Sequence, residues 1–206
     1  NLTVEDLNDM VTADPYEGKI KVCFTFDDGP SANTDKILDV LDSYGVKATF
    51  FVNGKEGFDE QYQRIVEEGH AIAMHSYSHD YGDIYSSLDA FAEDLYEIQS
   101  FIKDKTGVDC IYYRFPGGSS NTISNVPMED CIKYLNAKGV VYYDWNASAQ
   151  DAVAGGVSTT EIVNSIMTPI YNGGSDTYVI LSHDGQDKNT TIEALSIIIE
   201  QLAEME

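Results

Sequence analysis

The sequence is poor in basic residues. Lysine and arginine together number 12, against 35 aspartate and glutamate residues, so the formal net charge is −23 at pH 7. Nucleic-acid binding depends on lysine and arginine to neutralise phosphates, so no nucleic-acid partner is expected. The apolar runs, such as the one that ends at Leu181, are far shorter than the roughly 20 residues that cross a bilayer. We therefore expect no membrane span.

Cysteine is also scarce, and its spacing excludes a thiolate metal site. Cys23, Cys110 and Cys131 form no CxxC pair, and an odd number of cysteines cannot all pair internally. Cys23 lies in an apolar segment and is expected in the core, whereas a disulfide between Cys110 and Cys131 stays open. The chain also lacks the G-x-S-x-G motif of serine hydrolases and the H-E-x-x-H motif of zinc proteases.

The chain has enough apolar sequence for one folded domain. Of its 206 residues, 43% are hydrophobic and 23% are charged, which excludes a disordered or collagen-like chain. Residues 1–18 are polar and rich in turn formers, so we interpret them as a linker or N-terminal extension and 19–206 as the single folded domain. The chain starts at Asn1 without methionine or a signal peptide, as expected of a piece of a longer protein.

Short β-rich runs alternate with segments of helical period along the whole chain. This alternation is typical of a parallel α/β sheet or barrel. Apolar residues repeat on one face of segments that include 34–44, 87–106, 160–171 and 190–203, which predicts amphipathic helices there. The predicted strands are 20–27, 46–52, 70–75, 111–115, 140–145 and 177–182.

Uncommon polar residues fall at the ends of these predicted strands. They are Asp27 and Asp28 at the first strand, His75 and His79 at the third, Arg114 at the fourth, Asp151 after the fifth and His183 at the sixth. The carboxyl ends of parallel strands in a barrel converge on one rim, where such folds place their active sites. These side chains are therefore expected to meet.

The spacing of two histidines favours a catalytic metal site. His75 and His79 are four residues apart, which places both imidazoles on one face of a turn. With one carboxylate they would leave coordination positions open for water and substrate. Taken alone, the DDGP run is good turn chemistry and H-x3-H is a weak signal. Because these residues are all expected at the same rim of the barrel, a shared site explains their positions better than coincidence does.

Four motifs together resemble a known family. They are TFDDGP at 25–30, HSYSH at 75–79, RFPGG at 114–118 and LSH at 181–183. In this order they are similar to the polysaccharide deacetylases of carbohydrate esterase family four, and the resemblance spans about 20–200. It implies a distorted (β/α) barrel of about seven parallel strands with its active site at the C-terminal rim. It also implies one divalent metal, zinc first and cobalt second.

The resemblance implies roles for the residues that match the motifs. Asp28, joined by His75 and His79, would hold the metal. Asp27 would be the general base that takes a proton from water, and Arg114 would hold Asp27 in place. The metal would polarise the acetyl carbonyl and lower the pKa of water.

The acid and the substrate contacts complete the implied site. His183 would protonate the departing amine, tuned by Asp151, with Asp144 as the second choice. Two positions depart from the family pattern: Gly117 stands where a tyrosine is frequent, and Ala152 stands where a tryptophan usually follows the aspartate. The expected substrate contacts are Pro116, Gly117, Trp145 and Leu181.

These residues support several functions. The first hypothesis is a metal-dependent hydrolase that removes N-acetyl groups from N-acetylglucosamine residues of a cell-surface polysaccharide, peptidoglycan first and chitin-type oligomers second. An O-acetyl xylan esterase of the same fold stays open, although an acid His183 favours amide cleavage, because a leaving amine needs protonation more than a leaving alcohol does. The third hypothesis is a carbohydrate-binding relative that has lost catalysis. We expect a secreted or cell-surface monomer whose partner is an acetylated glycan.

Overall fold

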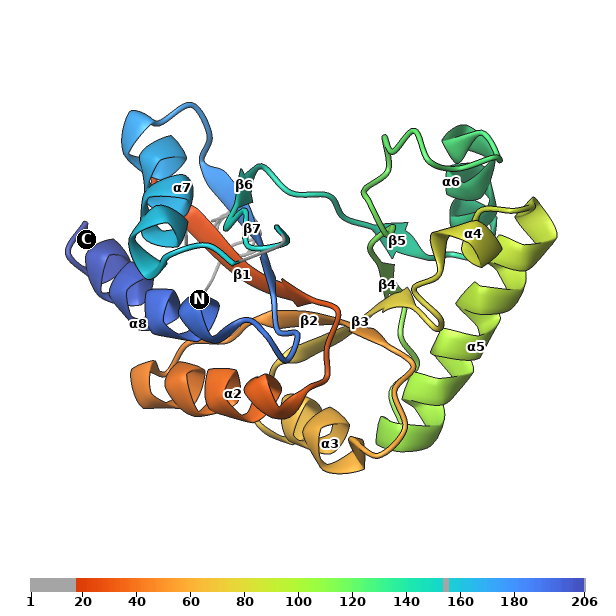
Figure 1. The fold of residues 1–206 in the computed structure, drawn as a ribbon, viewed down its shortest axis with the longest axis horizontal. Coiled ribbons are helices and arrows are strands. Elements are labelled where there is room, and N and C mark those ends of the chain that lie inside the picture. The colour runs from red at the N-terminus through yellow and green to blue at the C-terminus, as the bar shows by residue number, and fades with distance from the viewer. Residues whose placement is uncertain (1–17, 154–155, 206) are drawn as a thin grey trace, which may run out of the picture.

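The computed structural model describes residues 18–153 and 156–205, which form a curled parallel sheet with helices around its outside (Figure 1). The strands are β1 (Lys21–Asp27), β2 (Thr49–Asn53), β3 (Ala71–Ser76), β4 (Tyr112–Tyr113), β5 (Val141–Tyr142), β6 (Ala147–Ser148) and β7 (Thr177–His183). Their order in the sheet is β5-β4-β3-β2-β1-β7-β6, and every neighbouring pair is parallel. The predicted distorted (β/α) barrel is confirmed.

The helices follow the strands in the expected alternation. They are α2 (Ala32–Tyr44), α3 (Asp59–Glu67), α4 (Tyr81–Ile84), α5 (Leu88–Thr106), α6 (Met128–Ala137), α7 (Thr159–Asn172) and α8 (Asn189–Ala203). The four helices named from the sequence are confirmed to within two residues at either end. Among the helices of the described residues, none is long and apolar enough to cross a membrane.

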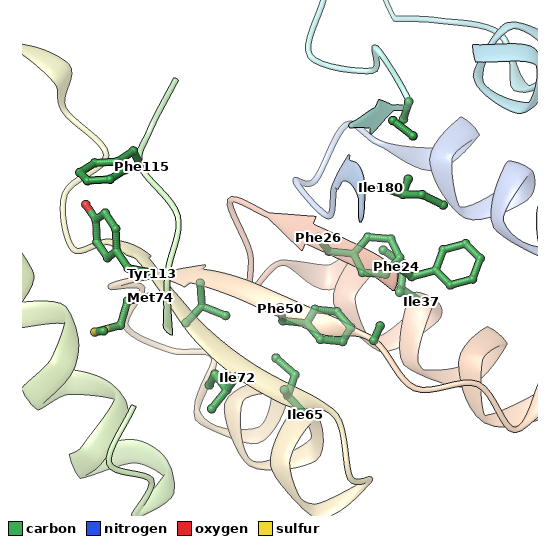
Figure 2. Close-up of a cluster of buried hydrophobic side chains, with 14 of the residues drawn as sticks. Phe24, Phe26, Ile37, Phe50, Ile65, Ile72, Met74, Tyr113, Phe115 and Ile180 are labelled. Atoms are coloured by element: carbon green, nitrogen blue, oxygen red, sulfur yellow. The ribbon is translucent and has the colours of Figure 1, made fainter. Parts of the chain in front are cut away.

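Alternation along the strands separates the core from the inside of the curl. In β1, Phe24 and Phe26 point outward to the helices and belong to the buried cluster that Figure 2 shows. The ring of Phe26 stacks on that of Phe50 in β2, with centroids 5.2 Å apart. Because side chains alternate between the two faces of a strand, Thr25 and Asp27 face the inside of the curl. The outer face therefore provides the hydrophobic core, and the inner face is free to carry chemistry.

A short crossing segment closes the curl. The edge strands β5 and β6 are consecutive in the sequence, so residues 143–146 run from one edge of the sheet to the other (Figure 1). The Arg114 guanidinium donates hydrogen bonds to the carbonyl oxygens of Tyr143 and Asp144, at 3.1 and 3.2 Å. The Asn146 side chain bonds to the backbone of β7. The barrel is thus closed on this side without a further strand.

The expected core position of Cys23 is wrong, and the disulfide that the sequence left open between Cys110 and Cys131 is not formed. Cys110 and Cys131 are buried free thiols rather than a disulfide, and the Cys110 thiol donates to the carbonyl oxygen of Ile72 at 3.3 Å. Cys23 is exposed rather than in the core, because it alternates with Phe24 and so faces the inside of the curl. The expected linker at 1–18 lies, except for its last residue, outside the described residues.

Candidate active site

Strand register brings the predicted residues to one rim. Asp27 at the end of β1 and His183 at the end of β7 are partners in the β1–β7 ladder. On the other side, the Arg114 N–H donates to the carbonyl oxygen of Met74 at 2.9 Å, which places Arg114 beside His75 of β3. The carboxyl ends of β7, β1 and β3 and the segment at Arg114 therefore lie at one rim of the sheet.

A cluster of three possible ligands lies at this rim. The nearest ligand atoms of Asp28, His75 and His79 all lie within 4.8 Å of one another. The Asp28 Oδ1 atom is 3.4 Å from Nε2 of His75 and 3.1 Å from Nε2 of His79. It is buried, yet it has no hydrogen-bond partner of good geometry among the described residues. Three possible ligand atoms this close to one another are an arrangement that suits a shared cation.

The backbone at two of these ligands is left-handed. Asp28 has φ 74° and His79 has φ 55°, a conformation that non-glycine residues adopt rarely and that is common at functional sites. The His79 N–H donates to the Ser76 hydroxyl at 2.7 Å. The carboxylate of Asp94, on α5, accepts hydrogen bonds from the backbone N–H groups of Tyr77 and Ser78, both at 3.0 Å. The loop before His79 is therefore fixed by a buried carboxylate.

Arg114 holds Asp27 from inside the barrel. Its side chain is fully buried, and its Nη1 atom donates to Oδ1 of Asp27 at 2.8 Å and to the Thr25 hydroxyl at 2.7 Å. The guanidinium carbon lies 4.1 Å from the ring centroid of Phe51 and 5.7 Å from that of Trp145. The N–H groups of Arg114 are held by hydrogen bonds, and the faces of its guanidinium group are covered by two aromatic rings. Arg114 therefore holds the Asp27 carboxylate in one orientation.

Asp151 is the carboxylate that contacts His183. Its Oδ1 lies 2.7 Å from Nδ1 of His183, and its Oδ2 accepts from the His183 N–H at 3.0 Å and the Thr191 hydroxyl at 2.8 Å. Burial lowers the pKa of His183, but the hydrogen bond and charge of Asp151 outweigh burial, so the pKa lies above its usual value. Asp144 instead accepts hydrogen bonds from the backbone and hydroxyl of Ser119.

The four expected substrate contacts differ in exposure. Pro116 and Leu181 are buried, and the Pro116 carbonyl oxygen accepts a hydrogen bond from the Tyr85 hydroxyl at 2.8 Å. Gly117 is exposed and Trp145 is partly exposed. No hydrogen bond within the described residues uses the Gly117 N–H. Of this set, Gly117 and Trp145 are the residues that a polymer is able to reach.

Sequence reasoning missed three residues that support this site. Asp94 holds the loop before His79, as described above. Lys55 donates from Nζ to the carbonyl oxygen of Asp28 at 2.6 Å. Asp184 is fully buried directly after His183. The sequence contained a weak signal for two of them. Asp94 lies on the apolar side of its helix, and Asp184 follows an apolar strand, as do the site residues that were predicted.

Solved structures share both this fold and much of the sequence. The catalytic domain of peptidoglycan N-acetylglucosamine deacetylase from Eubacterium rectale is 38% identical, with a TM-score of 0.86 over 94% of this chain and 88% of that one. A family-four carbohydrate esterase from Streptococcus mutans is 29% identical, with a TM-score of 0.81 over 100% of this chain and 89% of that one.

Sequence comparison agrees with the structural one. A peptidoglycan-N-acetylglucosamine deacetylase of Bacillus cereus is 32% identical over 91% of this chain and 65% of its own length. A bifunctional xylanase/deacetylase of Pseudobutyrivibrio xylanivorans is 34% identical over 88% of this chain. The chain spans only 28% of that second relative, and less than two thirds of the first. The family model for polysaccharide deacetylase matches residues 15–134, more than half of the sequence, and on this ground the chain belongs to the polysaccharide deacetylase family.

Proposed function

We propose that this chain is a metal-dependent hydrolase that removes N-acetyl groups from N-acetylglucosamine residues of a cell-surface polysaccharide. Peptidoglycan is the first choice of substrate and chitin-type oligomers are the second. One observation carries the proposal: a carboxylate base, Asp27, and an imidazole acid, His183, are register partners beside a cluster of three possible metal ligands. Relatives named for peptidoglycan and chitin deacetylation support the choice of polymer.

The three ligands fit a divalent cation such as zinc, or cobalt in its place. Nδ1 of His75 lies 2.8 Å from the carbonyl oxygen of Arg114. A carbonyl only accepts, so Nδ1 carries the proton and Nε2 is left as the ligand atom. His79 and Oδ1 of Asp28 complete a set of two imidazoles and one carboxylate. When bound, such a metal supplies a Lewis acid that polarises a carbonyl and lowers the pKa of water.

One carboxylate oxygen of Asp27 is held by a hydrogen bond, and the other is free to accept a proton. Its Oδ1 is occupied by Arg114, whereas Oδ2 points toward the ligand cluster and lies 3.9 Å from Nε2 of His75. A water molecule beside the cluster would give its proton to Oδ2 while its oxygen attacks the acetyl carbon. Gly117 is exposed, and its N–H, which forms no hydrogen bond with the described residues, would be the backbone donor to the acetyl oxygen in the transition state.

His183 supplies the proton that the leaving group needs. Breaking the amide bond leaves an amine, and expulsion is easier when its nitrogen is protonated as the carbon–nitrogen bond breaks. The Asp151 carboxylate fixes the Nδ1 side of the imidazole and favours its charged form. The products are a free amine on the sugar and acetic acid, which releases its remaining proton to solvent and becomes acetate. The proton that Asp27 accepted replaces, through solvent, the one that His183 gave to the amine.

An O-acetyl xylan esterase is the second candidate. A relative named as a bifunctional xylanase/deacetylase is 34% identical, and a solved esterase domain of a multidomain xylanase is 31% identical. The paired acid favours the amide, because an ester alcohol leaves with less help from a proton. A non-catalytic carbohydrate-binding relative is less well supported, since the base, the three ligands and the acid are all in place.

Acetate release tests the proposal directly. The protein would be incubated with peptidoglycan, a chitooligosaccharide and acetylated xylan, and the products mapped by mass spectrometry. We expect free amines on glucosamine residues, lost in Asp27→Asn but kept in Asp104→Asn, which changes an exposed carboxylate on α5. Release from xylan alone would favour the esterase. No release from any glycan by metal-loaded protein would contradict both and favour a binding function.

A further inference from the structure

Asp184 is a buried carboxyl group that the proposed reaction does not use. Its residue is fully buried, and Oδ2 accepts a hydrogen bond from the Thr34 hydroxyl at 2.6 Å. The other oxygen, Oδ1, is buried without a hydrogen-bond partner among the described residues. Burial raises the pKa of Asp184 to about 7. A group that is costly to bury and touches no solvent needs a reason to be there.

The contacts of Asp184 join the strand that carries the acid to the turn that carries the base. Its backbone N–H donates to the carbonyl oxygen of Asp27 at 3.2 Å. Its own carbonyl oxygen accepts a hydrogen bond from the Ser31 hydroxyl. Ser31 is the N-cap of α2, and its N–H donates to the same Thr34 hydroxyl that binds the Asp184 carboxyl. One residue thus bonds both ends of the turn between β1 and α2.

The carboxyl group also lies directly against the middle of that turn. A Cβ atom built on Gly29 would be 2.1 Å from Oδ2 and 2.3 Å from Oδ1 of Asp184. Position 29 therefore requires glycine because of this close approach rather than because of its backbone angles. The preceding residue, Asp28, is the ligand with the left-handed φ of 74°. The Asp184 carboxyl group therefore packs against the turn next to the proposed ligand Asp28, and Lys55 Nζ donates a hydrogen bond to the Asp28 carbonyl oxygen.

We propose that Asp184 is a positioning residue that fixes the turn bearing Asp27 and Asp28 against the end of β7, and so sets the metal ligand, the base and the acid in one mutual arrangement. The inference deepens the proposed function and rests on it for the roles of these three groups. Asp184 does not itself meet substrate, because it is enclosed between the turn, α2 and its own strand. It acts through Gly29, Ser31 and Thr34.

The affinity for cobalt(II) reports whether Asp28 is correctly placed beside the two imidazoles, and its measurement does not require turnover. Asp184→Ala removes the carboxyl group from beneath Gly29, so Asp28 would lose its fixed place beside the two imidazoles. We expect the affinity for cobalt(II), measured from its visible absorption spectrum, to fall by about 10-fold to 100-fold, the range for lost outer-shell partners. Turnover should fall with it while KM stays close to that of the unchanged protein.

A conservative variant and a matched control separate positioning from general stability. Asp184→Asn keeps the shape and an oxygen for the Thr34 hydroxyl, so it should recover most of the cobalt(II) affinity and turnover. Leu135→Ala opens a cavity in α6, away from the turn. It should lower the melting temperature as Asp184→Ala does, yet leave cobalt(II) affinity and turnover unchanged. If Asp184→Ala does not fold, Thr34→Val removes the hydrogen bond to the Asp184 carboxyl group, together with the one that the Thr34 hydroxyl accepts from the Ser31 N–H, with little change of volume.

The outcomes are distinct. Weaker cobalt(II) binding in Asp184→Ala or Thr34→Val, but not in Leu135→Ala, supports the positioning role. Equal cobalt(II) affinity and turnover in Asp184→Ala and Leu135→Ala would overturn it and leave Asp184 a structural residue only. Should the unchanged protein release acetate from no glycan, the proposed function fails, but the comparison of cobalt(II) affinities still decides the role of Asp184.

Discussion

Replacing Asp151 by asparagine should move the alkaline limb of the pH–rate profile to lower pH. The proposed acid works only while its imidazole is protonated, and the pKa of His183 is held above its usual value by the Asp151 carboxylate. Asparagine has the same shape and can still accept from Thr191 and from the His183 backbone, whose distances to Asp151 are 2.8 and 3.0 Å. The substitution therefore removes the charge with little change in structure.

The size of the shift follows from the contact between Asp151 and His183. Their side chains are 2.7 Å apart and both are largely buried. A hydrogen bond to a charged group contributes about 1.5–3 kcal/mol, and one pKa unit corresponds to about 1.36 kcal/mol. The imidazolium therefore loses about 1.5–3 kcal/mol of stabilisation when the anion is removed, and its pKa should fall. Burial, which opposes the charged form, remains in the variant, and the weaker effects of the Asp28 and Asp27 charges are unchanged, so the difference in pKa reports the Asp151 charge.

The assay is acetate release from a chitooligosaccharide as a function of pH, limited to the range in which circular dichroism shows the variant folded. Asp144→Asn is the matched control, because Asp144 bonds to Ser119 and not to His183. It should leave the alkaline limb in place. If Asp151→Asn keeps the limb and Asp144→Asn moves it, the assignment of Asp151 as the partner of the acid is wrong.

Three further predictions concern the ligand cluster. Chelation should abolish acetate release and zinc or cobalt should restore it, whereas full activity in a preparation shown by elemental analysis to be metal-free would contradict metal dependence. Asp27→Asn should lower turnover by about 10²–10⁴-fold and keep near-stoichiometric metal, while Asp28→Asn should lose both; the reverse pattern would exchange the two roles. Asp94→Ala should weaken cobalt(II) binding, because the loop before His79 loses its anchor, and unchanged affinity would refute that link.

The fold could be predicted from the sequence where a strand is long and a polar residue marks its end. β1 and β7 each contain seven residues, are strongly apolar and end in polar residues. The segments 111–115 and 140–145 were predicted as strands of similar length, but only two residues of each pair in the sheet. After β5, the carbonyl oxygens of Tyr143 and Asp144 accept hydrogen bonds from the Arg114 side chain instead of from a neighbouring strand. Such a partner depends on tertiary structure, so local propensity does not reveal it.

The part of the candidate site that lies at the carboxyl ends of parallel strands could be predicted from the sequence, because those ends meet at one rim. Placing polar residues after successive parallel strands was enough to bring Asp27, His75 and His183 together. The choice between Asp144 and Asp151 was not decided in this way, because it depends on the path of the segment after β5. Asp94 lies on the apolar face of α5, where an isolated carboxylate is unexpected. That position was a usable signal, since a buried carboxylate in a helix requires donors from elsewhere.

Backbone strain at the proposed ligands gives a reason for residues without proposed catalytic roles to affect the site. Left-handed φ values at non-glycine residues cost roughly 1–3 kcal/mol each and persist only where the surroundings impose them. Asp28 and His79 both have such values. Lys55 and Asp184 hold the turn at Asp28, and the Asp94 carboxylate holds the loop that leads to His79. The ligand positions are therefore set by hydrogen bonds within the protein, which lowers the cost of ordering them when a cation binds.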